Sequence, residues 1–252
     1  MRGAMAQGAE QHGETADLDA LERALVRARM WLHYQLSPKG DRAARKIFCL
    51  GPAKTGTSSL HALFEGNGLA SQHSPGNWRI ARYEAFSDRG DYRPFRTYAR
   101  DFPNAVFVLN TRGLRGYLSS HASHLQRRQS GEGIRAFPVQ FFVNRILRRN
   151  RHMAEVLAHF AGSERLIIAN IERAGAMAGV ARALGLDGAE EIHRHKTERQ
   201  RHAATEANID RALDRLGLTG QAAEPFIFPQ LLPESLARAA VAGTPAPERC
   251  FL

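Results

Sequence analysis

The stretch KIFCLGPAKTGTSSL, Lys46–Leu60, decides the fold predicted for this 252-residue chain. Its apolar run 47–50 predicts a short strand that is buried on both faces, as strands of parallel sheets are. Gly51 and Gly56 then predict a tight loop that wraps an anion, because glycine adopts backbone conformations that other residues avoid. The residues after the loop carry hydroxyls and are expected to cap the next helix: Thr57, Ser58 and Ser59.

The position of the lysine distinguishes this predicted phosphate cradle from an ordinary nucleoside-triphosphate loop, in which lysine directly follows the second glycine. Here Thr57 follows Gly56, and the lysine is Lys54, inside the loop. From that position the ammonium is expected to approach the anion beside the bond that breaks.

A second motif follows downstream. The run Ala105–Leu109 predicts another buried strand, and Arg112 comes soon after it. A helix predicted over 113–125 carries Ser120, eight residues after the arginine. A guanidinium can bind two phosphate oxygens at once, and a hydroxyl two helical turns further on can close the other side of the phosphate.

Together the two motifs resemble the sulfotransferases. The loop of that family is close to P-K-x-G-T-[TS], and a later strand ends in an arginine eight residues before a serine. Ala53 separates Pro52 from Lys54, so the proline lies one place earlier than in the family. The resemblance covers roughly residues 44–215.

The resemblance implies an α/β fold, a three-layer sandwich around a central parallel sheet of the P-loop-containing nucleotide-binding type. It implies in-line transfer of a sulfuryl group from 3′-phosphoadenosine 5′-phosphosulfate (PAPS) to a hydroxyl, or as a second choice an amine, without a metal. The residues that it assigns to the donor are Lys54, Thr55, Gly56, Thr57, Ser58, Ser59, Arg112 and Ser120. A late basic segment is added by analogy with the family, although its R-K-G-x-x-G motif is absent: Arg194, Lys196 and Arg199.

Sulfuryl transfer to a hydroxyl is aided by a general base, and two residues are candidates. His73 is the first choice, because an imidazole accepts a proton near neutral pH and His73 lies at the end of a predicted second strand. The chain has 11 histidines, so a surface role for His73 is the alternative. Asp88 is the second candidate, and its alternative role is that of a turn residue in Ser-Asp-Arg-Gly.

Composition limits the classes of protein. A chain of 252 residues with 43% hydrophobic content suits one substantial α/β domain, and its formal net charge of +10 favours a polyanionic partner. With two cysteines, no apolar run near the roughly 18 residues of a membrane span and no signal peptide, we expect a soluble cytoplasmic protein.

Four segments are predicted: a disordered leader at 1–15, a flanking helix and linker at 16–44, the α/β domain at 45–220, and a covering segment with a loose tail at 221–252. In the flanking helix, leucines at helical spacing are expected to pack on the sheet; binding to a membrane surface is the alternative. These leucines are Leu18, Leu21, Leu25 and Leu32.

A third strand is predicted at 165–169, followed by a helix over 174–188 and by another helix marked by Ile209, Leu213 and Leu216. The helices between the strands imply a parallel sheet. The loop 51–59, His73 and Arg112 would then meet at its carboxyl edge, where such sheets bind ligands. A helix predicted over 141–160 carries a basic cluster that is expected to be solvated, or alternatively to lie beside an anionic acceptor. The cluster comprises Arg145, Arg148, Arg149 and Arg151.

Two other functions stay open. A small-molecule kinase would use the same cradle but would need magnesium. A nucleic-acid-binding protein would explain the charge but not the cradle, and the chain shows no helix-turn-helix or aromatic stacking platform. His121 and His124 have helical spacing for a metal, but no third ligand is evident nearby, so no metal is predicted.

The acceptor is predicted only as a small molecule, lipid or carbohydrate. Aromatic residues of the acceptor-side segment either line its pocket or fill the core: Trp78, Tyr83, Phe86, Tyr92 and Phe95. The sequence does not predict the oligomeric state.

Overall fold

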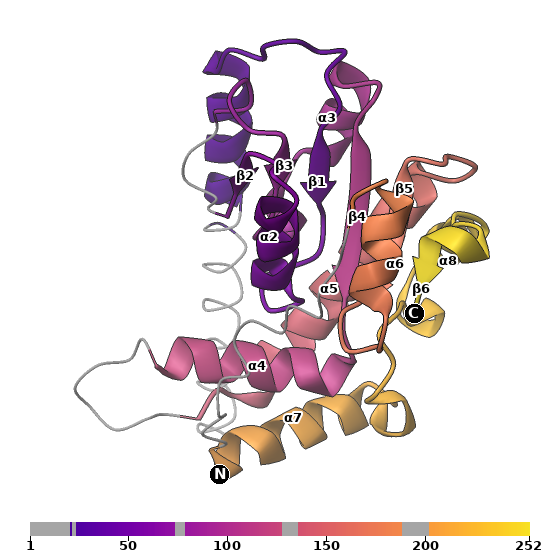
Figure 1. Ribbon diagram of the computed structural model, residues 1–252. Coiled ribbons are helices and arrows are strands. Elements are labelled where there is room, and N and C mark those ends of the chain that lie inside the picture. Colours follow the sequence, from indigo (N-terminus) through magenta and orange to yellow (C-terminus); the bar gives the residue numbers. More distant parts are fainter. Residues whose placement is uncertain (1–20, 22–23, 74–78, 128–135, 188–201) are drawn as a thin grey trace, which may run out of the picture.

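The computed structural model describes residues 21, 24–73, 79–127, 136–187 and 202–252. A six-stranded sheet lies at its centre with the order β2-β3-β1-β4-β5-β6, and every neighbouring pair is parallel. Helices cover both faces of the sheet, which confirms the expected α/β three-layer arrangement (Figure 1). The strands are β1 Ile47–Cys49, β2 Ser71–Gln72, β3 Ala85–Phe86, β4 Val106–Thr111, β5 Leu166–Asn170 and β6 Cys250–Phe251.

A helix over 24–36 precedes the sheet. The other α-helices are α2 Thr57–Gly66, α3 Phe95–Asp101, α4 Leu114–Gln126, α5 Val139–His159, α6 Ala176–Ala183, α7 Ala203–Arg215 and α8 Glu234–Ala242. The sequence predicts five of these seven, and α3 and α8 are the additions. None of the helices within the described ranges is long and apolar enough to cross a membrane.

Alternate residues of β1 point into two different cores, as the period of a strand requires. Phe48 packs with side chains of α3, α5 and the helix 24–36, whereas Ile47 and Cys49 pack with side chains of α2 and α6. The strand is therefore covered on both sides, which is why its sequence is continuously apolar.

The flanking helix is anchored differently from the prediction. Met30 and Tyr34 are buried against the sheet layer, and the Tyr34 hydroxyl donates a hydrogen bond of 2.5 Å to the Asp101 carboxylate. Leu21, Leu25 and Leu32 are more than half exposed, at 57%, 61% and 51%, so the expectation that they form the buried stripe is wrong. Leu18 and the leader 1–15 lie outside the described residues.

The segment 81–104, whose sequence predicts an irregular conformation, contains β3 and α3. Phe86 stacks on Phe48 with a ring-centroid distance of 5.0 Å, and both Phe86 and Phe95 are buried in the core. Tyr83 and Tyr92 pack against the same core. These aromatic residues therefore fill the interior; the other candidate, Trp78, lies outside the described residues.

The C-terminal segment is part of the domain and not a loose end. Residues 250–251 form β6, the edge strand beside β5, and α8 packs on α5. The approach is close at Gly243, where a Cβ atom would lie 2.0 Å from the Leu157 carbonyl oxygen. The sheet therefore extends past the predicted domain boundary at residue 220.

The order of the strands makes the place between β1 and β4 a topological switch point, where open α/β sheets form a crevice. From β1 the chain runs to β2 and β3 on one side of it, whereas β4 leads to β5 on the other side. Parallel sheets bind ligands at such a switch point, outside the carboxyl ends of the strands. In Figure 1, α4 and α7 lie at this end of the sheet, toward which the β1 arrow points.

Candidate anion-binding site at the carboxyl edge of the sheet

The loop after β1 has the compact shape that its glycines predict. A Cβ atom at Gly51 would lie 2.0 Å from the Asn110 carbonyl oxygen, and Gly56 has a left-handed φ of 82° immediately before α2. Gly56 is itself the N-cap and no side chain caps the helix, so the predicted hydroxyl caps are wrong. The residues expected to cap form the first turn instead, where no acidic residue opposes the binding of an anion: Thr57, Ser58 and Ser59.

Asn110, near the end of β4, holds this loop in place through side-chain hydrogen bonds. Its side-chain oxygen accepts a hydrogen bond of 3.0 Å from the Gly51 N–H, and its amide nitrogen donates to the carbonyl and hydroxyl oxygens of Thr55 at 3.0 and 2.6 Å. The Thr55 hydroxyl donates in turn to the Pro52 carbonyl at 2.6 Å. Thr55 is fully buried and its hydroxyl shapes the loop, so its side chain is already engaged within the protein.

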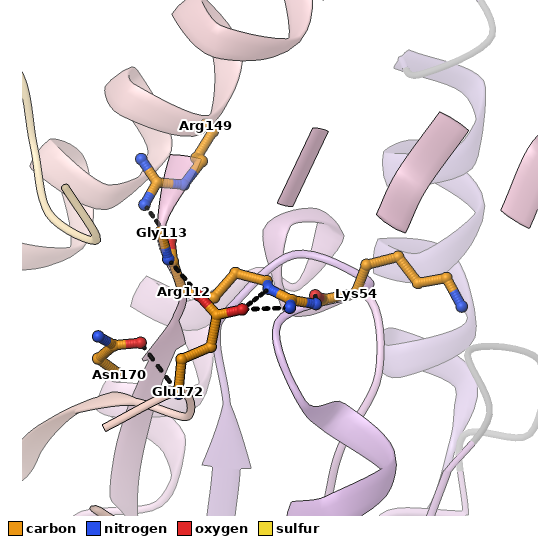
Figure 2. Close-up of polar contacts among 6 residues, drawn as sticks. All are labelled: Lys54, Arg112, Gly113, Arg149, Asn170 and Glu172. Atoms are coloured by element: carbon orange, nitrogen blue, oxygen red, sulfur yellow. Dashed lines mark hydrogen bonds and ion pairs between the residues drawn. The ribbon is translucent and has the colours of Figure 1, made fainter. Parts of the chain in front are cut away.

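Lys54 lies at the crest of the loop. Its φ of 74° is left-handed, a conformation that costs a non-glycine residue energy and that often marks functional sites. Its carbonyl accepts a hydrogen bond of 3.2 Å from Arg112, and its side chain extends away from that arginine (Figure 2). Burial lowers the pKa of the ammonium, Arg127 and Arg112 lower it further, and Asp88 opposes them.

The predicted base His73 contacts the loop directly. Its Nε2 lies 3.2 Å from the Ser58 hydroxyl and its Nδ1 lies 2.8 Å from the Ser87 hydroxyl. Ser87 has the Gln72 carbonyl as an acceptor at 3.4 Å, so its oxygen is free to accept from Nδ1–H. This assignment leaves the lone pair of His73 on Nε2, on the side of the loop.

Electrostatics favour the neutral form of His73. Burial lowers its pKa, the nearby His61, Arg93 and Lys54 lower it further, and Asp88 acts in the opposite direction. The His61 ring stacks on that of His73 with a centroid distance of 5.2 Å. At neutral pH the imidazole can therefore accept a proton, as a general base must.

The second candidate base, Asp88, lies in the loop after β3. Asp88 and Arg89 have left-handed φ values of 71° and 47°, and the Gly90 N–H donates a hydrogen bond of 3.0 Å to the Gly51 carbonyl. The two loops are therefore joined directly. Asp88 acts electrostatically on Lys54 and His73, so it lies within electrostatic range of both.

Arg112 is engaged by a carboxylate that the sequence analysis missed. Its Nε lies 3.1 Å from Glu172, its Nη2 pairs with the same oxygen, and the second Glu172 oxygen accepts from the Gly113 N–H at 3.1 Å (Figure 2). Glu172 is positioned by its own N–H, which donates to the Asn170 side chain at 3.1 Å. A phosphate that binds Arg112 must therefore compete with Glu172.

Ser120 lies on the side of α4 that faces Arg112. A Cβ atom at Gly116 would lie 3.4 Å from the Arg112 Nε, and Ser120 is one helical turn further along the same face. The joint role of Arg112 and Ser120 in holding one phosphate stays a prediction.

Arg149 secures the backbone around Arg112. It is 2% exposed and donates to the Thr111 hydroxyl at 2.9 Å, to the Arg112 carbonyl at 3.3 Å and to the Pro225 carbonyl at 2.5 Å. The expectation that the arginines of α5 are all solvated is therefore wrong for this residue. Burial lowers its pKa to about 10.

The late basic residues Arg194, Lys196 and Arg199 are not among the described residues. Within the described ranges, no group of three His, Cys, Asp or Glu residues is arranged to hold a metal ion.

Comparisons with models of protein families, with curated proteins and with solved structures found no match to this chain.

The residues that sequence reasoning missed share one signal. Asn110, Ser87 and Glu172 each lie at or just beyond the carboxyl end of a strand of the sheet. The same rule selected His73 and Arg112 from the sequence, and it extends to any polar residue at these ends. Glu172 follows the predicted third strand and could have been included on that basis.

Proposed function

We propose that this protein is a sulfotransferase that transfers a sulfuryl group from PAPS to a hydroxyl of a small-molecule, lipid or carbohydrate acceptor. The observation that carries this proposal is the contact of 3.2 Å between His73 and Ser58, which joins the candidate base to the candidate phosphosulfate loop. Lys54 lies beside both, within electrostatic range of His73. The assignment of the sheet to the P-loop type is part of the same proposal.

The residues present fit a phosphosulfate at the loop. The first turn of α2 contains no acidic residue, and helix N-termini bind anions through their free N–H groups. Lys54 provides a cation inside the loop, where the ordinary nucleoside-triphosphate loop has none. These features favour the sulfotransferase over the kinase.

Each group then has one role. When bound, the donor supplies the sulfuryl group and a bisphosphate leaving group. His73 Nε2 accepts the proton of the acceptor hydroxyl while that oxygen forms its bond to sulfur. The Lys54 ammonium and the N–H groups of the loop stabilise the charge that builds on the 5′-phosphate oxygen as the S–O bond breaks. Ser87 holds the imidazole in the required tautomer.

Calorimetry of the full chain tests the proposal. We expect 3′-phosphoadenosine 5′-phosphate, the bisphosphate product, to bind without magnesium at micromolar concentration, and ATP with magnesium to bind far more weakly. Lys54→Ala should weaken binding of the bisphosphate by about 1–3 kcal/mol, because a charge-assisted contact is lost. Lys39→Ala is the matched control, since Lys39 lies outside the crevice and contacts the helix 24–36.

Other outcomes point to other functions. Tight, magnesium-dependent binding of ATP with no response to the bisphosphate would identify a kinase. Binding to DNA that falls steeply with salt and is indifferent to Lys54→Ala would identify a nucleic-acid-binding protein.

A further inference from the structure

His121 on α4 is a buried imidazole that the proposed chemistry does not use. It is 9% exposed, and no residue in the described part of the chain forms a hydrogen bond with either of its ring nitrogens. Buried polar atoms in folded proteins are almost always paired, with protein, water or ligand. A fully unpaired imidazole next to a candidate active site therefore points to a ligand group.

Aromatic rings and a guanidinium surround this imidazole. The ring centroids of Tyr117 and Phe141 lie 6.1 and 6.4 Å from that of His121. The Arg145 guanidinium lies 4.7 Å from the centroid of Phe141, and its Nε also has no hydrogen-bond partner within the described ranges. Polar donors from two helices thus lie against the Phe141 ring.

Positive charge dominates this region. Burial, together with the nearby Arg145, Arg148, His124 and Lys54, lowers the pKa of His121 to about 2. The imidazole is therefore neutral and carries one N–H donor. Lys54 acts on both His73 and His121, so its ammonium lies within electrostatic range of both.

Among the described residues, the carboxylates beside these cations are fewer than the cations. Asp88 acts on Lys54, and Asp91 lies 3.9 Å from Arg148. The described cations on this side of the loop include Lys54, Arg127, Arg145 and Arg148. The described part of the chain therefore gives a positive field in a partly desolvated region, where an anion is bound more strongly than in water.

Other arginines of α5 show that this arrangement is specific. The terminal nitrogens of Arg149 donate to a hydroxyl and to carbonyls, although its Nε is unpaired among the described residues, and Arg151 is exposed and pairs with Glu155 at 2.9 Å. Arg149 therefore supports the fold and Arg151 belongs to the surface. Arg145 interacts with the Tyr117 hydroxyl, and within the described ranges it has neither the carbonyl partners of Arg149 nor the carboxylate of Arg151.

We propose that His121 and Arg145 bind an anionic group of the acceptor, so that the enzyme selects hydroxyl compounds that already carry a carboxylate, sulfate or phosphate. The N–H groups of His121 and Arg145 donate to the anionic oxygens, Arg148 and Lys54 add their field, and Phe141 and Tyr117 contact the carbon skeleton. This inference rests on the proposed function, because it places the anion on the acceptor side of Lys54.

Calorimetry with matched pairs of acceptors tests the inference. The protein is first saturated with the bisphosphate product and then titrated with 4-hydroxybenzoate or its neutral isostere 4-hydroxybenzamide, and with glucose 6-phosphate or glucose. We expect the charged member to bind about tenfold more tightly in at least one pair. The change Arg145→Gln or His121→Phe should abolish this preference and leave binding of the bisphosphate unaltered, whereas the control Arg151→Gln should change neither.

Equal binding within both pairs, tighter binding of the neutral members, or no binding of any member would overturn the inference. A preference that persists in both Arg145→Gln and His121→Phe would also overturn it. Should Arg145→Gln fail to fold, His121→Phe and Arg145→Lys carry the test. The first titration separates the two proposals: if the bisphosphate itself does not bind, the sulfotransferase proposal fails, and the pairs titrated alone still report on the anion site.

Discussion

The cations on the Arg112 side of the crevice and on the Lys54 side differ in the partners that the protein gives them. On the Arg112 side, guanidiniums are held by Glu172, a hydroxyl and backbone carbonyls. On the Lys54 side, the ammonium extends away from the ion pair of Arg112 and lies near two imidazoles whose pKa values are lowered. Charges that the protein satisfies itself fix the geometry, whereas the Lys54 ammonium, which extends away from that ion pair, is the cation proposed to contact a ligand.

The backbone shows the same difference. The three non-glycine residues with left-handed φ in the described ranges are Lys54, Asp88 and Arg89, all in the loops after β1 and β3. Such conformations persist only when the surrounding structure imposes them. The hydrogen bond between Gly90 and Gly51 and the brace from Asn110 supply that constraint.

The largest effect, on stability, should follow replacement of Arg149, the buried arginine beside Arg112. Arg149→Ala removes four hydrogen bonds, to the Thr111 hydroxyl and to the carbonyls of Arg112, Pro225 and Phe226. Among the described residues, only the Pro225 carbonyl keeps another side-chain donor, Thr111. We expect the free energy of unfolding to fall by about 3–5 kcal/mol, measured by urea denaturation. Arg151→Ala, at an exposed position of the same helix, should change stability by less than about 0.5 kcal/mol.

An Arg149→Met protein as stable as the wild type would contradict this view of the Arg112 side. It would show that the cost of burying the guanidinium exceeds the value of its hydrogen bonds, as happens for some buried charges.

A smaller effect, on rate alone, should follow removal of the base. His73→Gln should lower kcat by about 100-fold with little change in stability, because general-base catalysis contributes on this scale. Burial places the pKa of His73 below its ordinary value of about 6.5. The imidazole is thus neutral at pH 7, and wild-type activity should fall only as the pH drops below about 6.5.

The pH profile of sulfuryl transfer checks this role. His73→Gln should lose the acidic limb, and His61→Gln, which removes the stacked neighbour, should retain it. If His73→Gln retained the acidic limb of the pH profile, another group would be the general base. Asp88→Asn would then be the next variant to measure.

The smallest effect, on binding, should follow loss of the Glu172 carboxylate, which pairs with Arg112. Glu172→Gln removes the negative charge that competes for Arg112, so the bisphosphate product should bind about 3- to 10-fold more tightly in calorimetry. Glu206→Gln, which alters the pair with Arg115 at 3.2 Å, is the control and should leave binding unchanged. Weaker binding in Glu172→Gln would mean that the ion pair orients Arg112 for the phosphate instead of competing with it.

Much of the fold could be predicted from local patterns. Continuous apolar runs give β1, β4 and β5, and helical periodicity gives α4, α5, α6 and α7, since these patterns record burial directly. β3 and β6 have two residues each, too few for a period to be visible. The exposed leucines of the helix 24–36 show the limit of the method: periodicity reports that a helix is amphipathic, but not that its apolar stripe is the buried one.

The sequence by itself determined the loop and its neighbours. The glycine spacing, Lys54, and the polar residues that follow predicted strands are local features, and the parallel topology brings strand ends together. Tertiary structure alone decided how these residues are used. Glu172 reaches Arg112 across 60 residues of sequence, Arg149 is buried while its neighbour Arg151 is exposed, and Thr55 turns inward to Asn110. Such pairings depend on which side chains meet after the sheet has formed, and no periodicity encodes that.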